Sequence, residues 1–398
     1  MSEWKEYRID ELGKLGRGKS KHRPRNDASL FNGEYPFVQT GDIKAANFYL
    51  TEYSQTYTEK GLAQSKLWKK GTLCITIAAN IGETAILGLD ACFPDSIIGF
   101  TPYENKSDVR FIKYLFDLLK IHFQSISQGT TQDNLSQEKL LTIKFKAPDF
   151  QTQQKIANIL GTYDELIEVN NERIKILEET AQSIYKEWFV RFRFPNYQDT
   201  EFIKGVPKGW EIGKLGSLMK VNCKNVKLTE NEIIYYVDIS SVSTGRVDNK
   251  TLYNFSEAPG RAKRVVQHED IIFSTVRPEN KAYTMILNPE NNLIVSTGFA
   301  VLTPNESCFA TFIYMIISSN SFVDEMINKS KGSAYPQVSF DDIKNYNILI
   351  PNSKLMNYFD EIISPIFTQI ETLQQQNTEL RQIRDRLLPR LISGKMVV

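Results

Sequence analysis

Three short segments of this 398-residue chain match patterns with catalytic chemistry, and none has the context that the chemistry needs. Gly13-Lys-Leu-Gly-Arg-Gly-Lys-Ser20 fits the phosphate-binding loop G-x-x-x-x-G-K-S, but Lys21-His-Arg-Pro24 is a poor start for the helix that must cradle the phosphate. Pro94-Asp95 with Glu104-Asn-Lys106 imitates a metal-dependent nuclease and reads better as a turn. Asn288-Pro-Glu-Asn291 lacks the second proline and the aromatic residue with which methyltransferases hold adenine. We therefore expect no catalytic centre.

The residue types that bind metals are too scattered for a metal site. The first ten residues carry no apolar signal segment, and no apolar run approaches the roughly 20 residues of a membrane helix. The sequence predicts a cytoplasmic protein with free thiols, no metal and no membrane partner. The histidines without ligand spacing and the cysteines without a C-x-x-C pattern are His22, His122, His268, Cys74, Cys92, Cys223 and Cys308.

The remaining candidate functional groups are clusters of lysine and arginine. The net charge is only +1, so a nucleic-acid partner must be sought in local clusters. Lys14 to Arg25 hold six basic residues and no acidic one, and weaker clusters lie at Lys214 to Lys227 and at Arg261 to Arg264. Such density attracts phosphates, although a solvated surface explains a charge run equally well. The predicted phosphate contacts are Arg17, Lys19, Lys21, Arg23, Arg25, Arg261, Lys263 and Arg264.

Base recognition needs side chains that offer paired donors and acceptors in the major groove, with arginine suited to guanine and asparagine or glutamine to adenine. Candidates of these types lie in segments between predicted strands and near glycine. Each could equally be a turn residue that bonds its own backbone. The candidates are Gln39, Thr40, Thr130, Gln132, Arg277, Asn280, Lys281, Ser333, Tyr335 and Gln337.

An internal repeat relates the two halves of the chain. Gly129-Thr-Thr-Gln-Asp-Asn-Leu-Ser136 corresponds to Gly332-Ser-Ala-Tyr-Pro-Gln-Val-Ser339, and the offset of 203 residues continues without a gap through the segments that follow. Each copy also contains apolar segments typical of strands, such as Leu73 to Ala78 and Ile271 to Val276. The sequence predicts an α+β fold with two duplicated mixed α/β domains.

A long helical pattern follows each domain, after Pro148 and after Pro351. Apolar residues recur in it at alternating spacings of three and four, as a coiled-coil seam requires. Neither helix can bury its stripe alone, so we expect the two to pair as an antiparallel coiled coil. The predicted boundaries are a first domain at 1–149, a first helix at 150–195, a second domain at 196–352 and a second helix at 353–398.

Each helical seam carries an asparagine. The antiparallel register that matches most of the apolar layers sets Asn170 opposite Asn377. We hypothesise that this pair fixes the register at some cost in stability, as single polar seam positions do in other coiled coils. Two solvent-tolerated asparagines in an imperfect seam are an equal alternative.

Four segments of the sequence resemble the conserved regions of one protein family. Pro148-Asp-Phe-Gln-Thr-Gln-Gln-Lys-Ile-Ala-Asn-Ile-Leu160 and Ser183-Ile-Tyr-Lys-Glu-Trp-Phe-Val190 look like the central conserved region of Type I restriction-modification specificity subunits. Leu380-Arg-Gln-Ile-Arg-Asp-Arg-Leu-Leu-Pro-Arg-Leu-Ile-Ser-Gly-Lys395 is similar to the C-terminal conserved region, and Pro207-Lys-Gly-Trp-Glu211 also resembles the family. The chain departs from the pattern at two places: it has Ser353-Lys-Leu-Met356 where the first copy has Phe150-Gln-Thr-Gln153, and Trp4 lacks the Pro-x-Gly prefix.

The resemblance implies that each domain is a target-recognition domain that reads one half of a bipartite site in double-stranded DNA, while the helix pair sets the unread gap. A helix of about 38 residues is roughly 57 Å long, more than one turn of B-DNA. The resemblance also implies two modification subunits that carry S-adenosylmethionine, and restriction subunits that use ATP and Mg²⁺, with no cofactor and no catalysis on this chain. The competing interpretation is a coiled-coil adaptor that binds protein alone.

Overall fold

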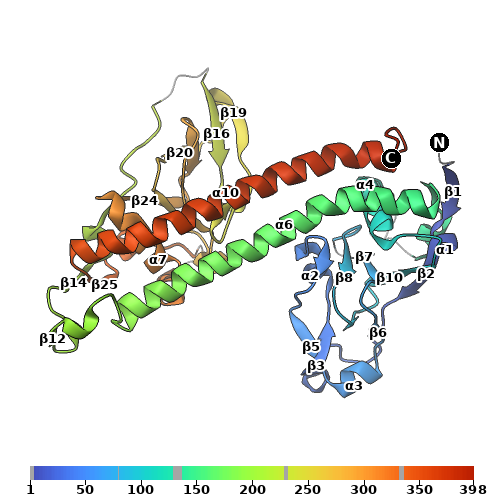
Figure 1. Cartoon of the computed structure of the whole chain (residues 1–398), viewed down its shortest axis with the longest axis horizontal. Helices are drawn as coiled ribbons and strands as arrows, with labels where there is room; N and C mark the ends of the chain where they lie inside the picture. The colour runs from blue at the N-terminus through green and yellow to red at the C-terminus, as the bar shows by residue number, and fades with distance from the viewer. Residues whose placement is uncertain (1–3, 79, 129–136, 228–231, 331–335) are drawn as a thin grey trace. The chain divides into compact units, whose positions relative to one another are not determined.

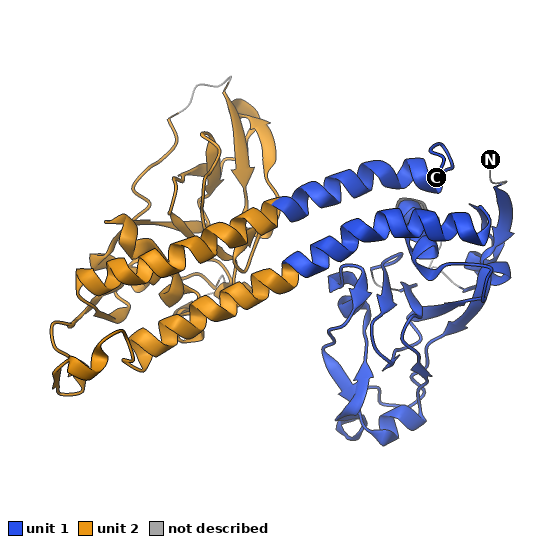
Figure 2. Ribbon diagram, in the orientation of Figure 1, with its two compact units in different colours: residues 1–170, 376–398 blue, residues 171–375 orange. Residues whose placement is uncertain are grey.

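The two halves of the sequence repeat fold with the same plan of sheets, each closed by a long helix. The computed structural model describes residues 4–78, 80–128, 137–227, 232–330 and 336–398. It divides into two units: unit 1 comprises residues 1–170 and 376–398, and unit 2 comprises residues 171–375 (Figure 2). None of the helices in the described ranges is long and apolar enough to span a bilayer.

The strands of unit 1 form one pair and two larger sheets (Figure 1). The pair joins β1 (Lys5–Arg8) to β11 (Lys144–Ala147). The first sheet has the order β2 (Gly13–Arg17), β10 (Ile97–Pro102), β7 (Leu73–Thr76), β8 (Thr84–Leu87), β4 (Tyr49–Leu50), and the second has the order β5 (Gln55–Tyr57), β3 (Phe31–Phe37), β9 (Ala91–Cys92), β6 (Leu67–Trp68). The helices are α1 (Ile9–Leu12), α2 (Thr40–Ala45), α3 (Glu59–Ala63), α4 (Val109–Gln128) and α5 (Gln137–Thr142).

Unit 2 repeats this plan. Its pair joins β14 (Glu211–Lys214) to β25 (Asn347–Ile350). Its sheets have the orders β15 (Met219–Val221), β24 (Phe299–Pro304), β21 (Ile271–Ser274), β22 (Tyr283–Met285) and β19 (Thr251–Asn254), β16 (Ile233–Val237), β23 (Leu293–Ser296), β20 (Ala262–Val265). Two hairpins are added, β12 (Phe202–Ile203) with β13 (Val206–Pro207) and β17 (Val242–Ser243) with β18 (Arg246–Val247), and the helices are α7 (Ala310–Ile317), α8 (Asn320–Ser330) and α9 (Phe340–Lys344).

The pairing directions agree for the strands that the two sheet orders share; the first sheet of unit 1 has the additional strand β4, parallel to β8. β3 runs parallel to β9 as β16 runs parallel to β23, and both parallel pairs are flanked by antiparallel neighbours. The closing strands keep the offset of the sequence repeat, since β11 begins at Lys144 and β25 at Asn347. This agreement confirms the prediction of two duplicated mixed α/β domains.

Two long helices complete the fold, α6 (Phe150–Tyr185), which is continued by a π-helical turn at Lys186–Val190, and α10 (Ser353–Ile392). A side chain caps the start of each one. The Asp149 carboxylate accepts the Thr152 amide at 3.0 Å, and the Asn352 side chain accepts the Leu355 amide at 2.9 Å. These caps satisfy amides that have no partner within a helix, at the same position of each repeat.

The first turns of the two helices differ at one buried position. In unit 1 the Gln153 side chain is buried, accepts the Asp108 amide at 3.1 Å and donates to the carbonyls of Pro148 and Lys106. Met356 occupies the corresponding position of unit 2 and is buried among apolar residues. The departure of the second copy from the family pattern therefore replaces a hydrogen-bonding anchor with an apolar one.

Each unit pairs its own half of α6 with its own half of α10, and each pair joins the core of its domain. In unit 1, Leu160 and Leu391 are buried in one cluster with Phe111 of α4. In unit 2, Ile363 and Ile370 of α10 belong to one cluster with Phe312 of α7. The helix faces are apolar because they complete these cores, and the two helices form the predicted antiparallel coiled coil.

The unit 1 half of this pair contains buried polar contacts. Asn170 Nδ2 donates to Asn377 Oδ1 at 2.9 Å, and both residues are buried, so the asparagines that the sequence register sets opposite one another are in contact. A buried carboxylate lies nearby: Asp164 forms an ion pair with Arg384 and accepts a hydrogen bond from the Tyr114 hydroxyl. The register that sets Asn170 opposite Asn377 also sets Tyr163 opposite Arg384. The charged partner of Arg384 is the next residue, Asp164.

Candidate nucleic-acid interface

The predicted basic run of unit 1 leaves β2 and crosses the turn before β10. The Gly18 amide donates to the Ile97 carbonyl at 2.9 Å, and the Lys19 amide donates to the Phe93 carbonyl at 3.1 Å. A Cβ on Gly18 would lie only 2.2 Å from the Pro94 carbonyl oxygen, so this glycine allows a close backbone approach. The segment after Gly18 is irregular rather than helical, and its glycine pattern therefore reflects packing and not a phosphate-binding loop.

Several of the predicted basic side chains have partners within unit 1. Arg17 donates to the Asp95 carbonyl, and Arg25 forms an ion pair with the Asp95 carboxylate at 2.9 Å. Arg23 donates at 2.8 Å to the carbonyls of Ser20 and His22. Asp95, which belongs to the nuclease-like pattern, thus organises two arginines of the loop.

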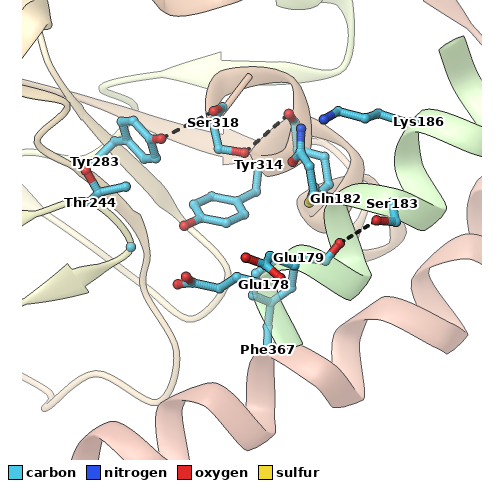
Figure 3. A pocket seen from close by; sticks show the side chains of 12 residues that line it. Glu178, Glu179, Gln182, Ser183, Lys186, Thr244, Tyr283, Tyr314, Ser318 and Phe367 are labelled. Carbon is cyan, nitrogen blue, oxygen red and sulfur yellow. Dashed lines mark hydrogen bonds between the residues drawn. The ribbon is translucent and has the colours of Figure 1, made fainter. Parts of the chain in front are cut away.

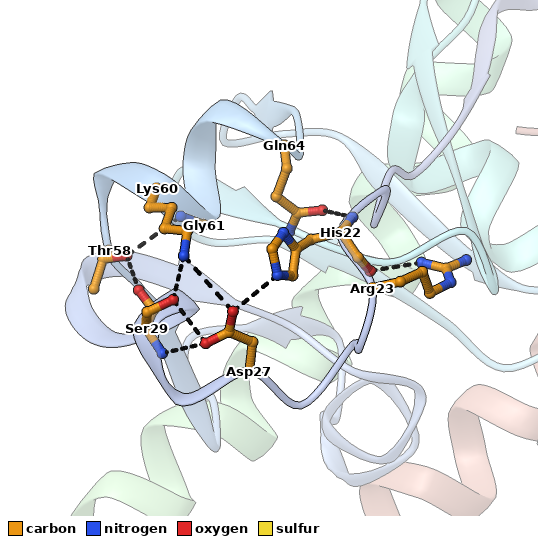
Figure 4. Close-up of polar contacts among 8 residues, drawn as sticks. All are labelled: His22, Arg23, Asp27, Ser29, Thr58, Lys60, Gly61 and Gln64. Atoms are coloured by element: carbon orange, nitrogen blue, oxygen red, sulfur yellow. Dashed lines mark hydrogen bonds and ion pairs between the residues drawn. The ribbon is translucent and has the colours of Figure 1, made fainter.

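A second carboxylate anchors the far end of the same loop (Figure 4). Asp27 Oδ2 lies 2.9 Å from His22 Nε2 and 3.6 Å from Lys60 Nζ. Hydrogen bonds from the Ser29 hydroxyl and amide hold the pKa of the Asp27 carboxyl well below its usual range. The His22 amide also donates to the Gln64 side chain at 3.0 Å. The loop is therefore fixed to the residues around α3 rather than extended into solvent.

Three lysines form the basic patch of unit 1, defined here as Lys14, Lys19 and Lys66. The Lys66 ammonium lies 3.3 Å from the centroid of the Trp68 ring. Lys66 Nζ lies beside β2, since a Cβ on Gly16 would be 3.7 Å from it. Partial desolvation and the ammonium groups of Lys14 and Lys19 lower the pKa of Lys66. All three are exposed and make no ion pair within the described part of the chain. The same is true of Lys21. Sequence reasoning missed Lys66, which lies far from the basic run.

The structure brings two predicted clusters of unit 2 together. The segment around Asn225 lies beside β20: Asn225 and Arg264 form an isolated β-bridge, and the Val226 amide donates to the Lys263 carbonyl at 2.9 Å. Lys224, from the cluster before it, donates to the Gln267 side chain at 2.5 Å. The part of the first cluster at Lys224 to Lys227 and the cluster at Arg261 to Arg264 therefore lie on one surface, whereas Lys214 lies in β14 and donates to the Asn347 side chain at 2.6 Å.

This surface contains the basic groove of unit 2, a groove of about 570 Å³. Arg264 donates to the Asn225 side chain at 2.9 Å, while its buried Nε has no hydrogen-bond partner. Arg261 and Lys263 are exposed, so cationic groups are available around the groove. The lining residues are Asn225, Val226, Phe255, Ala258, Pro259, Gly260, Ala262, Lys263, Arg264 and Thr297.

The basic patch and the basic groove occupy the same place in the repeated fold. Lys14 lies in β2 and Lys19 shortly after it, and Asn225 follows β15, the strand at the same end of the corresponding sheet. Lys66 directly precedes β6, and Lys263 and Arg264 lie in β20; β6 and β20 each pair with the second member of the parallel pair of their unit. The two clusters are not similar residue by residue, so their shared position in the fold could not be predicted from their sequences. The repeated placement makes a shared ligand the simplest explanation for both surfaces.

Two of the predicted base-reading segments meet in unit 2. The Arg277 amide donates to the Pro336 carbonyl at 3.2 Å, Val276 forms a bridge with Gln337, and the Val338 amide donates to the Thr275 carbonyl at 2.9 Å. Arg277, Asn280 and Gln337 are exposed in this loop cluster, and Lys281 donates to the Asn320 side chain at 3.2 Å. The candidates Thr130, Gln132, Ser333 and Tyr335 lie outside the described residues.

Gln39 has local partners. Its amide donates to the Gln55 side chain at 2.7 Å, and its backbone N–H donates to the Asp42 carboxylate, also at 2.7 Å. Thr40 is the first residue of α2. Both residues are half-buried, and Gln39 would have to exchange its contact with Gln55 for a contact with a base. Within the described ranges, no group of three or more His, Cys, Asp or Glu residues is placed to hold a metal ion.

Comparisons with known proteins agree with this geometry. A family profile described as "Type I restriction modification DNA specificity domain" matches residues 1–179 and again residues 207–383. The Type I restriction enzyme MjaIX specificity subunit of Methanocaldococcus jannaschii is 27% identical over 417 residues, which cover 100% of this chain and 94% of that protein. The HindI specificity subunit of Haemophilus influenzae is 32% identical over 160 residues, or 38% of this chain and 35% of that protein.

A solved structure shares the fold. The S subunit of a Type I restriction-modification system from M. genitalium matches with a TM-score of 0.60 and 16% identity, over 98% of this chain and 96% of that one. The chain belongs to the family of Type I restriction-modification DNA specificity subunits. It is a recognition subunit and not a catalytic one, as the sequence predicted, and subunits of this class work in complexes with other restriction-modification subunits and DNA. The adaptor interpretation is not favoured.

Proposed function

We propose that each unit recognises one half of a bipartite site in double-stranded DNA, with its basic surface on the phosphates. The observation that carries this proposal is the recurrence of that surface at one place of the repeated fold, as Lys14, Lys19 and Lys66 in unit 1 and around Lys263 and Arg264 in unit 2. Phosphate contacts hold a protein in register on a duplex, whereas contacts with base edges select the sequence.

Base selection in unit 2 is assigned to the loop cluster around Arg277, Asn280 and Gln337. These side chains are exposed, and the arginine, asparagine and glutamine types offer the donor and acceptor patterns that guanine and adenine match. Several hydrogen bonds join the two segments of the cluster, so its backbone is held before DNA arrives. Such order lowers the entropy that binding must remove.

The helices set the spacing of the two half-sites. α6 has 36 residues and α10 has 40, lengths of roughly 54 and 60 Å at about 1.5 Å per residue, and both contribute residues to each unit. A straight helix is stiffer than a loop, so its length is a suitable ruler for an unread gap of fixed size.

The helices also dock two modification subunits. Ile159, Leu166 and Val169 of α6 are 38%, 47% and 55% exposed. Their spacings of seven and three residues are those of a second coiled-coil stripe, which a helix of a partner would cover. The modification subunits carry S-adenosylmethionine, and restriction subunits bring ATP and Mg²⁺, so this chain supplies the address and the partners supply the chemistry.

The test is to sequence N6-methyladenine in the host genome with and without this gene. We expect one bipartite motif, interrupted by a gap of fixed length, that disappears on deletion and returns when the gene is restored. Restoring a chain with Lys19→Glu and Lys66→Glu should give weaker methylation at the same motif, while the control Lys175→Glu, an exposed lysine on α6, should give full methylation. Methylation that persists after deletion would contradict the proposal.

A further inference from the structure

A pocket in unit 2 shares no lining residue with the basic groove and has a different chemistry (Figure 3). It lies between α6, α7 and the β17–β18 hairpin, and α10 contributes one side. Its volume of about 460 Å³ falls within the roughly 300–1,000 Å³ that small-ligand pockets have. The lining residues that matter here are Glu178, Glu179, Gly245, Tyr283, Tyr314 and Phe367.

A carboxylate without a close cation borders the pocket. Glu178 is exposed, borders the pocket and makes no ion pair within the described part of the chain. The nearby Arg246 is held by Asp248 at 2.5 Å. Desolvation by the surrounding protein raises the pKa of the Glu178 carboxyl, and Arg246 offsets that rise in part. A cation placed in the pocket would meet a carboxylate that Arg246 compensates only in part.

A buried hydroxyl also faces the pocket. Tyr314 is only 7% exposed, and its hydroxyl has no hydrogen-bond partner among the described residues. In Figure 3 this hydroxyl points to the same side of the pocket as the Glu178 carboxylate. Tyr283, by contrast, donates its hydroxyl to the Ser318 carbonyl at 3.3 Å. Because Tyr314 lines the pocket and its hydroxyl oxygen accepts no hydrogen bond there from the described residues, this oxygen is available to a ligand donor.

Aromatic rings supply the apolar walls. The rings of Tyr314 and Phe367 are perpendicular with centroids 5.0 Å apart, and the centroids of Tyr283 and Tyr314 are 6.3 Å apart. Aromatic faces beside a carboxylate attract ammonium and guanidinium groups and repel phosphate. Lys186 also lines the pocket, which therefore presents two carboxylates, those of Glu178 and Glu179, against one ammonium group.

We propose that this pocket binds an organic cation, an alkylammonium or alkylguanidinium group, through the Glu178 carboxylate, the Tyr314 hydroxyl and the surrounding rings. The hydroxyl oxygen accepts a hydrogen bond from the cation, and the alkyl part lies against Phe367. A free amine of the cell and a lysine or arginine side chain of another protein present the same group, so the chemistry is shared and the source is settled by experiment. The site does not depend on the proposed reading of DNA.

The experiment is calorimetric titration of the full chain with butylguanidinium and with butylurea, its neutral analogue of the same shape. We expect the cation to bind and butylurea to bind at least about tenfold more weakly. Glu178→Gln should weaken cation binding about tenfold, and Tyr314→Phe, which removes only the hydroxyl, about fivefold. Glu172→Gln, which removes the same charge from an exposed position of α6 outside the pocket, should leave affinity unchanged. Equal binding of the two compounds, or unchanged affinity in a folded Glu178→Gln chain, would overturn the proposal.

A second titration identifies the source of the cation. The chain is first assembled with its modification subunits, and butylguanidinium is then added. If a partner side chain fills the pocket, binding of the probe is lost in the complex; if the ligand is a free amine, the complex binds the probe as the chain does. Either result retains the cation site, whereas failure of the isolated chain to bind the probe removes it.

Discussion

The seam of the helix pair contains buried polar contacts in unit 1, and apolar residues take the corresponding positions in unit 2, although both halves come from the same repeat. Asp164, buried in unit 1 with Arg384, has Phe367 as its counterpart 203 residues later, and Arg384 itself corresponds to the fully buried Ala181. Tyr314 packs on Phe367 where Tyr114 bonds Asp164. At this level of the coil, unit 1 has an ion pair and unit 2 has an aromatic contact.

The asparagines follow the same rule. Asn170 corresponds to Leu373, and Asn377 corresponds to Ile174, so the hydrogen bond of unit 1 is replaced by apolar packing in unit 2. Apolar layers stabilise a coiled coil with little selectivity, whereas buried polar layers penalise every other register. The comparison suggests a division of labour in which unit 1 specifies the register and unit 2 contributes stability.

Removing the buried carboxylate should have the largest effect. Asp164→Ala leaves the Arg384 charge and the Tyr114 hydroxyl without their buried partner, so we expect a loss of about 3–5 kcal/mol in the free energy of unfolding. Denaturant titration measures the loss, and hydrogen exchange should place it in residues 150–170. The double variant Asp164→Phe, Arg384→Ala installs the residues of unit 2 and should recover most of it. A single variant that costs under about 1 kcal/mol would show that the ion pair is unimportant.

The asparagine pair should show strong coupling. Asn170→Leu leaves the buried Asn377 amide without this partner, and we expect a loss of about 1–3 kcal/mol. Adding Asn377→Ile creates the residues found in unit 2 and should return stability to the level of the wild type or above it. A double-mutant cycle measures the coupling. Strictly additive losses would mean that the two asparagines do not act together.

Exchange of the first-turn anchors sharpens the comparison. Gln153→Met removes the acceptor for the Asp108 amide and the donor to the Pro148 carbonyl, so a loss of about 1–2 kcal/mol is expected in unit 1. Met356→Gln should also destabilise unit 2, because it buries an amide among apolar residues. Thermal unfolding of both variants checks the pair. If either exchange is silent, the two anchors are interchangeable.

Substitutions in the basic patch of unit 1 and the basic groove of unit 2 should have the smallest effects, and the two effects should be similar in size. Lys66→Ala in unit 1 and Lys263→Ala in unit 2 each remove one phosphate contact, so each should reduce the slope of log affinity against log salt by about 0.9. Lys175→Ala, on an exposed position of α6, is the control and should leave the slope unchanged. Fluorescence anisotropy with a labelled duplex provides the slopes. An effect confined to one unit would break the equivalence of the two surfaces.

The repeat, the two α/β domains and the facing asparagines could be predicted from the sequence, because each follows from an offset or a spacing that can be counted. Contacts between distant segments could not. Lys66 joins Lys14 only when β6 and β2 are placed, and the bond from Gln39 to Gln55 requires β3 and β5 to pair.

Within the coil, the register predicted from the sequence is correct to within one residue. That distance along the helix is shorter than the length of a long side chain. The register matched Arg384 with Tyr163, whereas the guanidinium extends to Asp164, the residue that follows. The sequence did not predict a buried role for Asp164, because an acidic residue beside a seam is ordinarily exposed to solvent.

The most direct test of the central claim, that each unit reads its own half-site, is binding by the assembled complex to duplexes in which one half-site or the other is scrambled. Arg277→Ala changes a loop of unit 2 only. The account predicts that this variant loses about 1–3 kcal/mol of discrimination against scrambling of one half-site and keeps full discrimination at the other. Equal loss at both half-sites, or at neither, would contradict it.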